Sequence, residues 1–314
     1  KALLHVLAEN KIDLLEIERV GHRVVHGGEQ FTKEILITDR FLRDLRKYNK
    51  LAPLHNPNNI AGILACMKFL PKAKNFAVFD TGFHATIPDY AYLYPLPYRF
   101  YREYAIRRYG FHGISHEYVS DQAAKKIKKK TCNLITCHLG SGCSIAAIKA
   151  GKSVDTSMGF TPLEGLMMSS RTGDIDPAIV FYLLKEGMTA KEIDHVFNSQ
   201  SGLLGVSGMK DMRDIMVASG YKIPGYVCKT KFSKEQVRLA RLALKMFVYR
   251  VIKYIGAYMA VLGKVDAIVF TAGIGERNQD IRDFIVKGLP IKPKVLVIPT
   301  NEELMIARIV LKRR

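Results

Sequence analysis

The sequence lacks several features that mark particular classes of protein. It has five cysteines, an odd number, and no two of them have the CxxC spacing. A disulfide framework is therefore not expected, and this cysteine usage suits a reducing compartment. The spacing of Cys132, Cys137 and Cys143 does not match a zinc site, and the alternation of residues around them indicates a strand.

Long hydrophobic runs and a signal peptide are also missing. The longest apolar stretch, residues 247–262, contains Arg250 and Lys253 and is too short to span a membrane. Charged residues between positions 9 and 16 interrupt the apolar residues near the start, unlike a signal peptide. We therefore expect a soluble, cytoplasmic protein with no membrane partner. The chain starts at Lys1 without a methionine, which suggests a fragment of a longer protein.

The composition is that of a globular protein with a strong basic bias. Of 314 residues, 48% are hydrophobic and 25% are charged, which excludes a disordered chain. The 48 basic residues exceed the 29 acidic ones by 19, and the densest runs are 125–130 and 311–314. Such an excess suits nucleic acid, an anionic membrane or an anionic small molecule. No nucleic-acid recognition motif accompanies it, so we expect solvated helix faces and anionic ligands rather than nucleic acid.

Short apolar strands alternate with helical patterns along the chain. The predicted strands are 76–79, 133–136, 144–148, 266–270 and 295–298, and most of them end in Gly, Thr or Asp. The second and third of these strands suggest a hairpin around a glycine turn. This alternation predicts an α/β fold with ligand-binding groups at the carboxyl ends of the strands.

The longest predicted helix begins after Ser233 and ends at Gly263. Ser233 and Gln236 form a capping-box pattern, and apolar residues then follow at helical spacing. Residues 218–232 have no periodicity and are expected to form a surface loop. No internal repeat or low-complexity linker divides the chain, so a domain boundary is expected near residues 80–88.

Two glycine turns follow predicted strands. They are His138–Gly142 (HLGSG) and Gly273–Glu276 (GIGE), and glycine lets backbone N–H groups approach a phosphate closely. Neither turn matches the P-loop or the dinucleotide-binding fingerprint. A structural tight turn explains either one alone, whereas the two together leave phosphate binding and a structural role equally open.

Isolated charges lie in apolar or glycine-rich surroundings at four positions. Arg23 lies in a strand-like run and Arg171 in a loop before a helix, whereas Asp80 ends a strand and Glu302 begins a helix. Guanidinium groups bind carboxylates and phosphates, and carboxylates at strand ends suit Mg²⁺. A structural ion pair or a helix cap is the alternative at each position.

Neighbouring residues refine these choices. Thr300 and Glu303 match a capping box, which leaves Glu302 as the candidate metal ligand. His112 and His116 lie four residues apart, but HExxH is absent, so zinc is not expected. A histidine that donates to phosphate oxygens fits His112 better.

Ten stretches of the chain resemble the acetokinase family, and they occur in the family's order. They are GHRVVHGGEQF (21–31), LAPLHNP (51–57), FDTGFHATIP (79–88), RRYGFHGISHEYV (107–119), CHLGSGCS (137–144), SVDTSMGFTPLEGL (153–166), RTGDIDPA (171–178), GLLGVSG (202–208), FTAGIGE (270–276) and VIPTNEEL (297–304). The resemblance implies two RNase H-like α/β domains of the actin, Hsp70 and sugar kinase type, with the active site in the cleft between them. We expect residues 1–83 with 305–314 to form one domain and 84–304 the other, nucleotide-binding one.

The resemblance also implies an activity and its residues. The expected reaction is reversible, Mg²⁺-dependent transfer of a phosphoryl group from ATP to acetate, by a cytoplasmic homodimer; Mn²⁺ is an alternative metal. The implied catalytic residues are Asp80, His112, Arg171 and Arg23, and Arg23 also binds the substrate. The implied pocket for the acetate methyl group is made of Val25, Leu54, Phe111 and Pro162. The implied ATP-binding residues are His138, Leu139, Gly140, Ser141, Gly142, Asp211, Met212, Arg213, Gly273, Ile274, Gly275, Glu276 and Arg277, and the implied metal ligand is Glu302.

The chain departs from the family pattern in three places. The usual opening phosphate loop has no counterpart before Arg23, Ser141 replaces the usual asparagine of HLGNG, and a segment between Glu276 and residue 297 is shorter than usual. The expectation is therefore that this chain alone is a weak kinase. Two alternatives stay open: a propionate or butyrate kinase, and a kinase-like protein that binds nucleotide without turnover.

Overall fold

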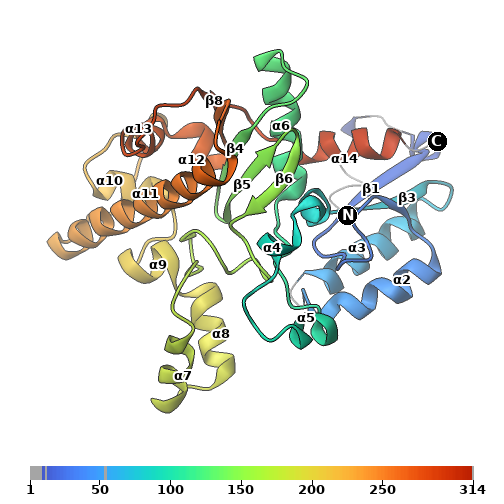
Figure 1. The fold of residues 1–314 in the computed structure, drawn as a ribbon, viewed down its shortest axis with the longest axis horizontal. Helices are drawn as coiled ribbons and strands as arrows, with labels where there is room; N and C mark the ends of the chain where they lie inside the picture. Colours follow the sequence, from blue (N-terminus) through green and yellow to red (C-terminus); the bar gives the residue numbers. More distant parts are fainter. Residues whose placement is uncertain (1–8, 11–12, 53–54, 313–314) are drawn as a thin grey trace. The chain divides into compact units, whose positions relative to one another are not determined.

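The computed structural model describes residues 9–10, 13–52 and 55–312 (Figure 1). The chain forms two compact units. The first comprises Lys1–Ala85, Phe111–Tyr118 and Asn301–Arg314, and the second comprises Thr86–Gly110 and Val119–Thr300. The predicted domains place 111–118 in the second domain, whereas Ile114 and Tyr118 pack in the core of the first unit. The predicted boundaries themselves stay a prediction.

The first unit is built on a sheet whose described strands have the order β1-β3-β2. Strands β1 (Arg19–Val24) and β3 (Lys74–Phe79) are parallel, and β2 (Ile35–Leu36) is antiparallel to β3. Its helical segments are η1 (Leu14–Glu16), α2 (Asp39–Arg46), η2 (Lys47–Lys50), α3 (Asn56–Phe69), η3 (Gly82–Thr86), the start of α6 (Gly113–Ile127) and α14 (Glu302–Leu311).

The residues of β3 alternate between two apolar cores. Ala77 and Phe79 pack with residues of α2 and α3, whereas Phe76 and Val78 pack with residues of α14 and the start of α6. Because successive side chains point to opposite faces of a strand, both faces of β3 are covered. Asp80 follows directly after β3 and is itself buried.

The second unit is built on a mixed sheet with the strand order β6-β5-β4-β7-β8. Its strands are β4 (Leu134–Leu139), β5 (Cys143–Lys149), β6 (Lys152–Thr156), β7 (Ala267–Thr271) and β8 (Val295–Val297). Neighbours among β4, β5 and β6 are antiparallel, and β7 is parallel to both β4 and β8. The mixed α/β architecture and the predicted hairpin between β4 and β5 are confirmed.

The longest helix of this unit is α11, which packs against β5 and β4 and runs beside the sheet in Figure 1. The helices are α4 (Asp89–Tyr92), α5 (Arg99–Tyr104), the rest of α6, α7 (Ala178–Lys185), α8 (Ala190–Ser199), α9 (Gly202–Ser207), α10 (Met212–Ala218), α11 (Lys234–Leu262), α12 (Ala272–Arg277) and α13 (Gln279–Lys287). The predicted ends of α11 are confirmed: Ser233 and Gln236 form a capping box, and Gly263 follows the helix with φ of 68°.

One predicted helix cap is wrong. The N-cap of α14 is Asn301, whose side chain accepts a hydrogen bond from the backbone N of Leu304, rather than Thr300. Both residue types cap helices, and the chain direction before the helix decides which one is in place. No helix among the described residues is long and apolar enough to cross a membrane.

Candidate active site

Arg23 lies between two carboxylates in the first unit. Its Nη2 is 2.6 Å from Oδ2 of Asp80, and its Nε is 3.6 Å from Oε2 of Glu302. Burial alone lowers the pKa of the guanidinium, but Asp80 and then Glu302 more than offset this, and the pKa lies above its usual value. The Arg23 side chain is still 42% exposed. The cation is therefore held in one orientation while part of it stays open to an anion.

The parallel strands place these groups together. Arg23 lies opposite Val78 in the pairing of β1 with β3, and the backbone N of Asp80 donates to the carbonyl oxygen of Val24. Glu302 is the first residue of α14, which packs against β1. Burial raises the pKa of Glu302, and Arg23 only partly opposes this rise. Three of the predicted site residues thus meet at one end of the sheet.

Asp80 keeps one carboxylate oxygen without a hydrogen-bond partner. Oδ2 accepts from Arg23 and, at 3.3 Å, from the backbone N of His112, whereas the buried Oδ1 has no partner among the described residues. A buried carboxylate oxygen without a hydrogen-bond partner is costly. A cation or a substrate group is therefore the natural complement of Oδ1.

His112 adopts an unusual backbone conformation beside Asp80. Its φ is +57°, in the left-handed region that few residues other than glycine adopt. Gly113, which begins α6, donates its N–H to the carbonyl oxygen of Asp80, and a Cβ at Gly113 would lie 2.2 Å from that oxygen. The predicted phosphate-binding histidine is thus held close to Asp80. His116, in contrast, is fully buried with its ring against that of His84.

The structure describes part of the predicted methyl pocket. Val25 and Phe111 are buried residues of the first unit, Pro162 belongs to the second unit, and the prediction for Leu54 lies outside the described residues. Two asparagines of α3 that the sequence did not single out hold the backbone of Val25 and His26. Asn59 accepts from the backbone N of Val25, while Asn56 accepts from the N of His26 and donates to its O. They belong to the stretch NPNN (56–59) at the start of α3, where nothing in the sequence separates them from other polar residues at a helix start.

The two glycine turns lie at the same end of the second sheet, where β4 and β7 have their carboxyl ends. The turn 138–142 comprises the last two residues of β4 and the link to β5, and the segment 273–277 lies just after β7. Strands β4 and β7 are parallel neighbours. The second segment forms the short helix α12 rather than an open turn. The carboxyl ends of adjacent parallel strands are where nucleotides bind in α/β proteins. The carboxyl ends of β4 and β7 are therefore the best candidate for the ATP site.

Glu276 and Ser141 make different contacts at this end of the sheet. Oε1 of Glu276 accepts hydrogen bonds from the N of Ala272 (2.7 Å), the hydroxyl of Thr271 (3.2 Å) and the N of Thr300 (3.0 Å). Its carboxylate therefore stabilises the protein backbone. Ser141 lies in the tip of the other turn, where its carbonyl oxygen accepts from the N of Ser169.

Asp211, Met212 and Arg213 form the start of α10. Asp211 is the N-cap and makes an ion pair of 2.6 Å with Arg213, which lowers the pKa of its carboxyl group through the hydrogen bond. The guanidinium carbon of Arg213 lies 4.5 Å from the centre of the Tyr226 ring, and Met212 is buried. Arg213 thus presents an oriented cation to solvent.

Arg171 has no acidic partner among the described residues. Its Nη1 donates to the carbonyl oxygen of Pro162 (3.4 Å) and lies 3.8 Å from the sulfur of Met168. Burial lowers the pKa of this guanidinium from its usual value. A half-buried cation whose charge is not neutralised is well suited to bind an anion that arrives with the substrate.

Comparisons with known proteins agree with this arrangement. The sequence model of the acetokinase family matches residues 1–293. An acetate kinase of Thermoanaerobacter pseudethanolicus is 49% identical over 98% of this chain and 81% of its own length, and one of Halothermothrix orenii is 50% identical over 93% and 77%.

Solved structures show the same relationship. A propionate kinase of Francisella tularensis is 42% identical with a TM-score of 0.89, over 99% of this chain and 83% of its own. An acetate kinase of Porphyromonas gingivalis is 39% identical with a TM-score of 0.88, over 99% and 82%. With a family match over most of its length and relatives near half identity, the chain belongs to the acetokinase family.

Proposed function

We propose that the chain catalyses the reversible transfer of a phosphoryl group from ATP to acetate. The observation that carries this proposal is Arg23, a cation fixed by Asp80 and Glu302 but 42% exposed. A guanidinium of this kind binds the carboxylate of a small acid. Val25 and Phe111 are buried residues of the same unit as Arg23, and their apolar side chains suit a short alkyl group.

Acetate is already ionised at neutral pH, so no general base is needed to generate the nucleophile. Arg23 orients the carboxylate, and Arg171 and His112 stabilise the charge that develops on the phosphoryl oxygens. Arg171 suits this task because it has no counter-ion among the described residues. The glycine turns after β4 and β7 are proposed to bind the nucleotide, together with Arg213.

Asp80 and Glu302 are proposed to hold Mg²⁺ or Mn²⁺. No group of three His, Cys, Asp or Glu side chains among the described residues could hold a metal by itself. Magnesium in kinases is commonly bound by one or two carboxylates together with substrate phosphates, and the unpaired Oδ1 of Asp80 fits such a ligand. When bound, the ion neutralises negative charge on the phosphate oxygens.

The alternative acceptors are propionate and butyrate, because a propionate kinase is among the similar structures. Each added methylene changes discrimination by only about 1–3 kcal/mol in a fitted pocket. Acetate is favoured because the curated relatives at 49–50% identity are acetate kinases. Comparing kcat/KM for acetate, propionate and butyrate distinguishes these substrates.

The test of the proposed function is acyl phosphate formation, trapped with hydroxylamine, from ATP, Mg²⁺ and acetate. Product that requires all three components is the expected result. Nucleotide binding without acyl phosphate would instead support a kinase-like protein that does not turn over. A mobility shift with duplex DNA at physiological salt would support the nucleic-acid alternative.

We also propose a cytoplasmic homodimer. Large apolar side chains are exposed on α7 (Phe181 and Tyr182) and on α11 (Tyr249 and Val261), and burial against a second copy would remove them from water. The buried free cysteines 132, 137 and 143 suit a reducing compartment. Light scattering of the protein and of a Phe181→Lys, Tyr249→Lys variant tests the dimer, which the variant is expected to weaken.

A further inference from the structure

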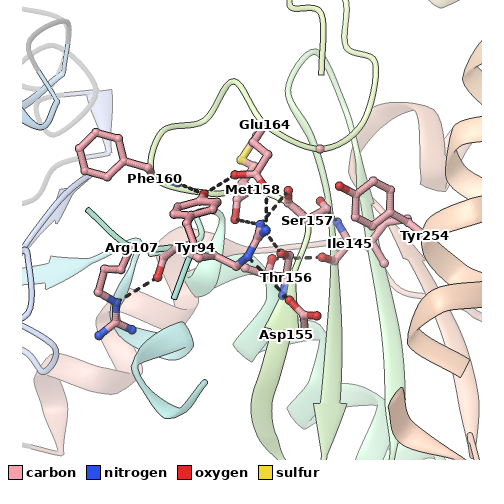
Figure 2. Close-up of polar contacts among 12 residues, drawn as sticks. Tyr94, Arg107, Ile145, Asp155, Thr156, Ser157, Met158, Phe160, Glu164 and Tyr254 are labelled. Atoms are coloured by element: carbon pink, nitrogen blue, oxygen red, sulfur yellow. Dashed lines mark hydrogen bonds and ion pairs between the residues drawn. The ribbon is translucent and has the colours of Figure 1, made fainter. Parts of the chain in front are cut away.

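Arg108 concentrates its hydrogen bonds on a single loop of the second unit. Its Nη1 donates to three successive carbonyl oxygens, those of Thr156 (3.0 Å), Ser157 (3.3 Å) and Met158 (3.1 Å). Its Nη2 donates to Oε1 of Glu164 at 2.5 Å. Figure 2 shows Thr156, Ser157, Met158 and Glu164 close together, with Tyr94 beside Glu164. One guanidinium thus joins both ends of the segment 156–164.

The geometry of the loop depends on this cation. Three carbonyl oxygens that point to the same place repel one another, and a charged donor with several N–H groups satisfies them together. The Arg108 side chain is 17% exposed, and Glu164 and Asp155 lie near it as counter-ions. Thr156 and Ser157 are also hydrogen-bonded to Ile145 of β5, so Arg108 adds to these contacts the link between the start of the loop and Glu164.

Tyr94 adds a second attachment to the same segment. Its hydroxyl donates to Oε2 of Glu164 and accepts from the backbone N of Phe160 at 2.8 Å. A Cβ at Gly159 would overlap both the Glu164 carboxylate and the Tyr94 hydroxyl. The loop is thus folded tightly around the carboxylate of Glu164.

A further attachment lies on the other side of Glu164. The N of Gly165 donates to Oδ1 of Asp174 (2.8 Å). Oδ2 of Asp174 accepts from the hydroxyl of Tyr254 (2.7 Å), and its backbone carbonyl oxygen accepts from Nη1 of Arg250 (2.9 Å). Arg171 and Pro162 flank this region, and Arg171 donates to the carbonyl oxygen of Pro162. The attachments at Glu164 and Asp174 therefore enclose the segment that carries Arg171.

We propose that Arg108 is a positioning residue that sets the 156–171 loop and, through it, the guanidinium of Arg171 and the ring of Pro162. This inference rests on the proposed function, because it assigns those two groups to phosphoryl transfer and to the methyl pocket. Arg108 itself need not touch a substrate. Its effect passes through Glu164 and the carbonyl oxygens of 156–158.

The first test is steady-state kinetics of Arg108→Gln in the full chain, at a temperature well below unfolding. Misplacing Arg171 is expected to lower kcat by about 10–100-fold per folded molecule, with little change in nucleotide affinity. Arg108→Lys keeps a charge opposite Glu164 and is expected to recover part of the loss. The control is Arg238→Gln, which removes an exposed arginine that pairs with Glu235 and should leave kcat unchanged. Wild-type kcat in Arg108→Gln would overturn the proposal.

The second test is amide hydrogen exchange, which does not depend on activity. Faster exchange in Arg108→Gln confined to residues 156–171, with β4 and β5 unchanged, supports the proposal. Unchanged exchange in that loop, or a general increase throughout the chain, overturns it. If Arg108→Gln does not fold, Tyr94→Phe loosens the same loop by one hydroxyl and is measured in both ways. Wild-type protein that makes no acyl phosphate from any of the three acids contradicts the proposed function, but the exchange result still decides the role of Arg108.

Discussion

Arg23 donates a hydrogen bond of 2.6 Å to Oδ2 of Asp80, and the other oxygen of that carboxylate is buried with no partner among the described residues. This asymmetry separates two tasks within one side chain. Oδ2 fixes the cation that is proposed to bind acetate, and Oδ1 is left for a metal or a substrate group. An unpaired buried oxygen calls for an explanation, and a partner that arrives with the ligand supplies one for Oδ1.

Asp80→Asn is expected to lower kcat/KM at least about 100-fold and to raise the Mg²⁺ concentration needed for half-maximal rate. The amide keeps the size of the side chain but removes its charge, so Arg23 loses its ionic partner and the proposed metal loses a ligand. Acyl phosphate formation is measured as Mg²⁺ is varied. Full activity with an unchanged Mg²⁺ dependence would show that the assignment of Asp80 is wrong. Asp44→Asn, which alters an exposed ion pair with Lys47 in the same unit, is the control.

Arg171→Ala is expected to reduce kcat by about 10²–10⁴-fold, as for other donors that act on the transition state. The loss should appear in kcat because Arg171 has no ionic partner among the described residues and is free to engage the moving phosphoryl group. Initial rates over a range of acetate and ATP concentrations separate the two parameters. A rise in acetate KM with unchanged kcat would reassign Arg171 to ground-state binding.

The sequence predicts the parts of this protein that depend on local patterns. The apolar run of β3 predicts that Asp80 follows the end of that strand, and the capping box at Ser233 predicts the start of α11. Thr300 fails as a cap because the adjacent Asn301 can form the same kind of hydrogen bond, and only the chain direction distinguishes them.

The contacts around Arg108 and Asn56 could not be predicted from the sequence. Arg108 binds backbone carbonyl oxygens, which every residue carries, so no pattern of side chains marks it. Asn56 and His26 meet only after α3 packs beside the end of β1. The roles of the catalytic and pocket residues come from the family resemblance, and the structure supplies their neighbours.

His26 is expected to make stability fall in acid. Burial lowers the pKa of His26 from 6.5 to about 4, and its Nδ1 accepts a hydrogen bond from the N of Gly28. Between pH 6.5 and 4 the unfolded chain binds the proton that the folded chain does not. The stabilisation is therefore complete above pH 6.5 and decreases as the pH falls, by about 3 kcal/mol at pH 4. Urea unfolding of wild type and His26→Gln at several pH values measures this, and equal pH dependence in the two proteins would contradict it.

Gly113→Ala is expected to damage both stability and activity, whereas Gly256→Ala in α11 should do neither. A Cβ at Gly113 would lie 2.2 Å from the carbonyl oxygen of Asp80, so the start of α6 must move away from Asp80 and carry His112 with it. Overlap with backbone cannot be relieved by a side-chain rotation, and we expect a loss of about 1–3 kcal/mol. Gly256 lies in a helix with open space at its Cβ position, so alanine there should stabilise by about 0.5–1 kcal/mol. Thermal unfolding and acyl phosphate formation are measured for both variants. Wild-type kcat in Gly113→Ala would mean that the close approach of His112 to Asp80 is not needed for the reaction.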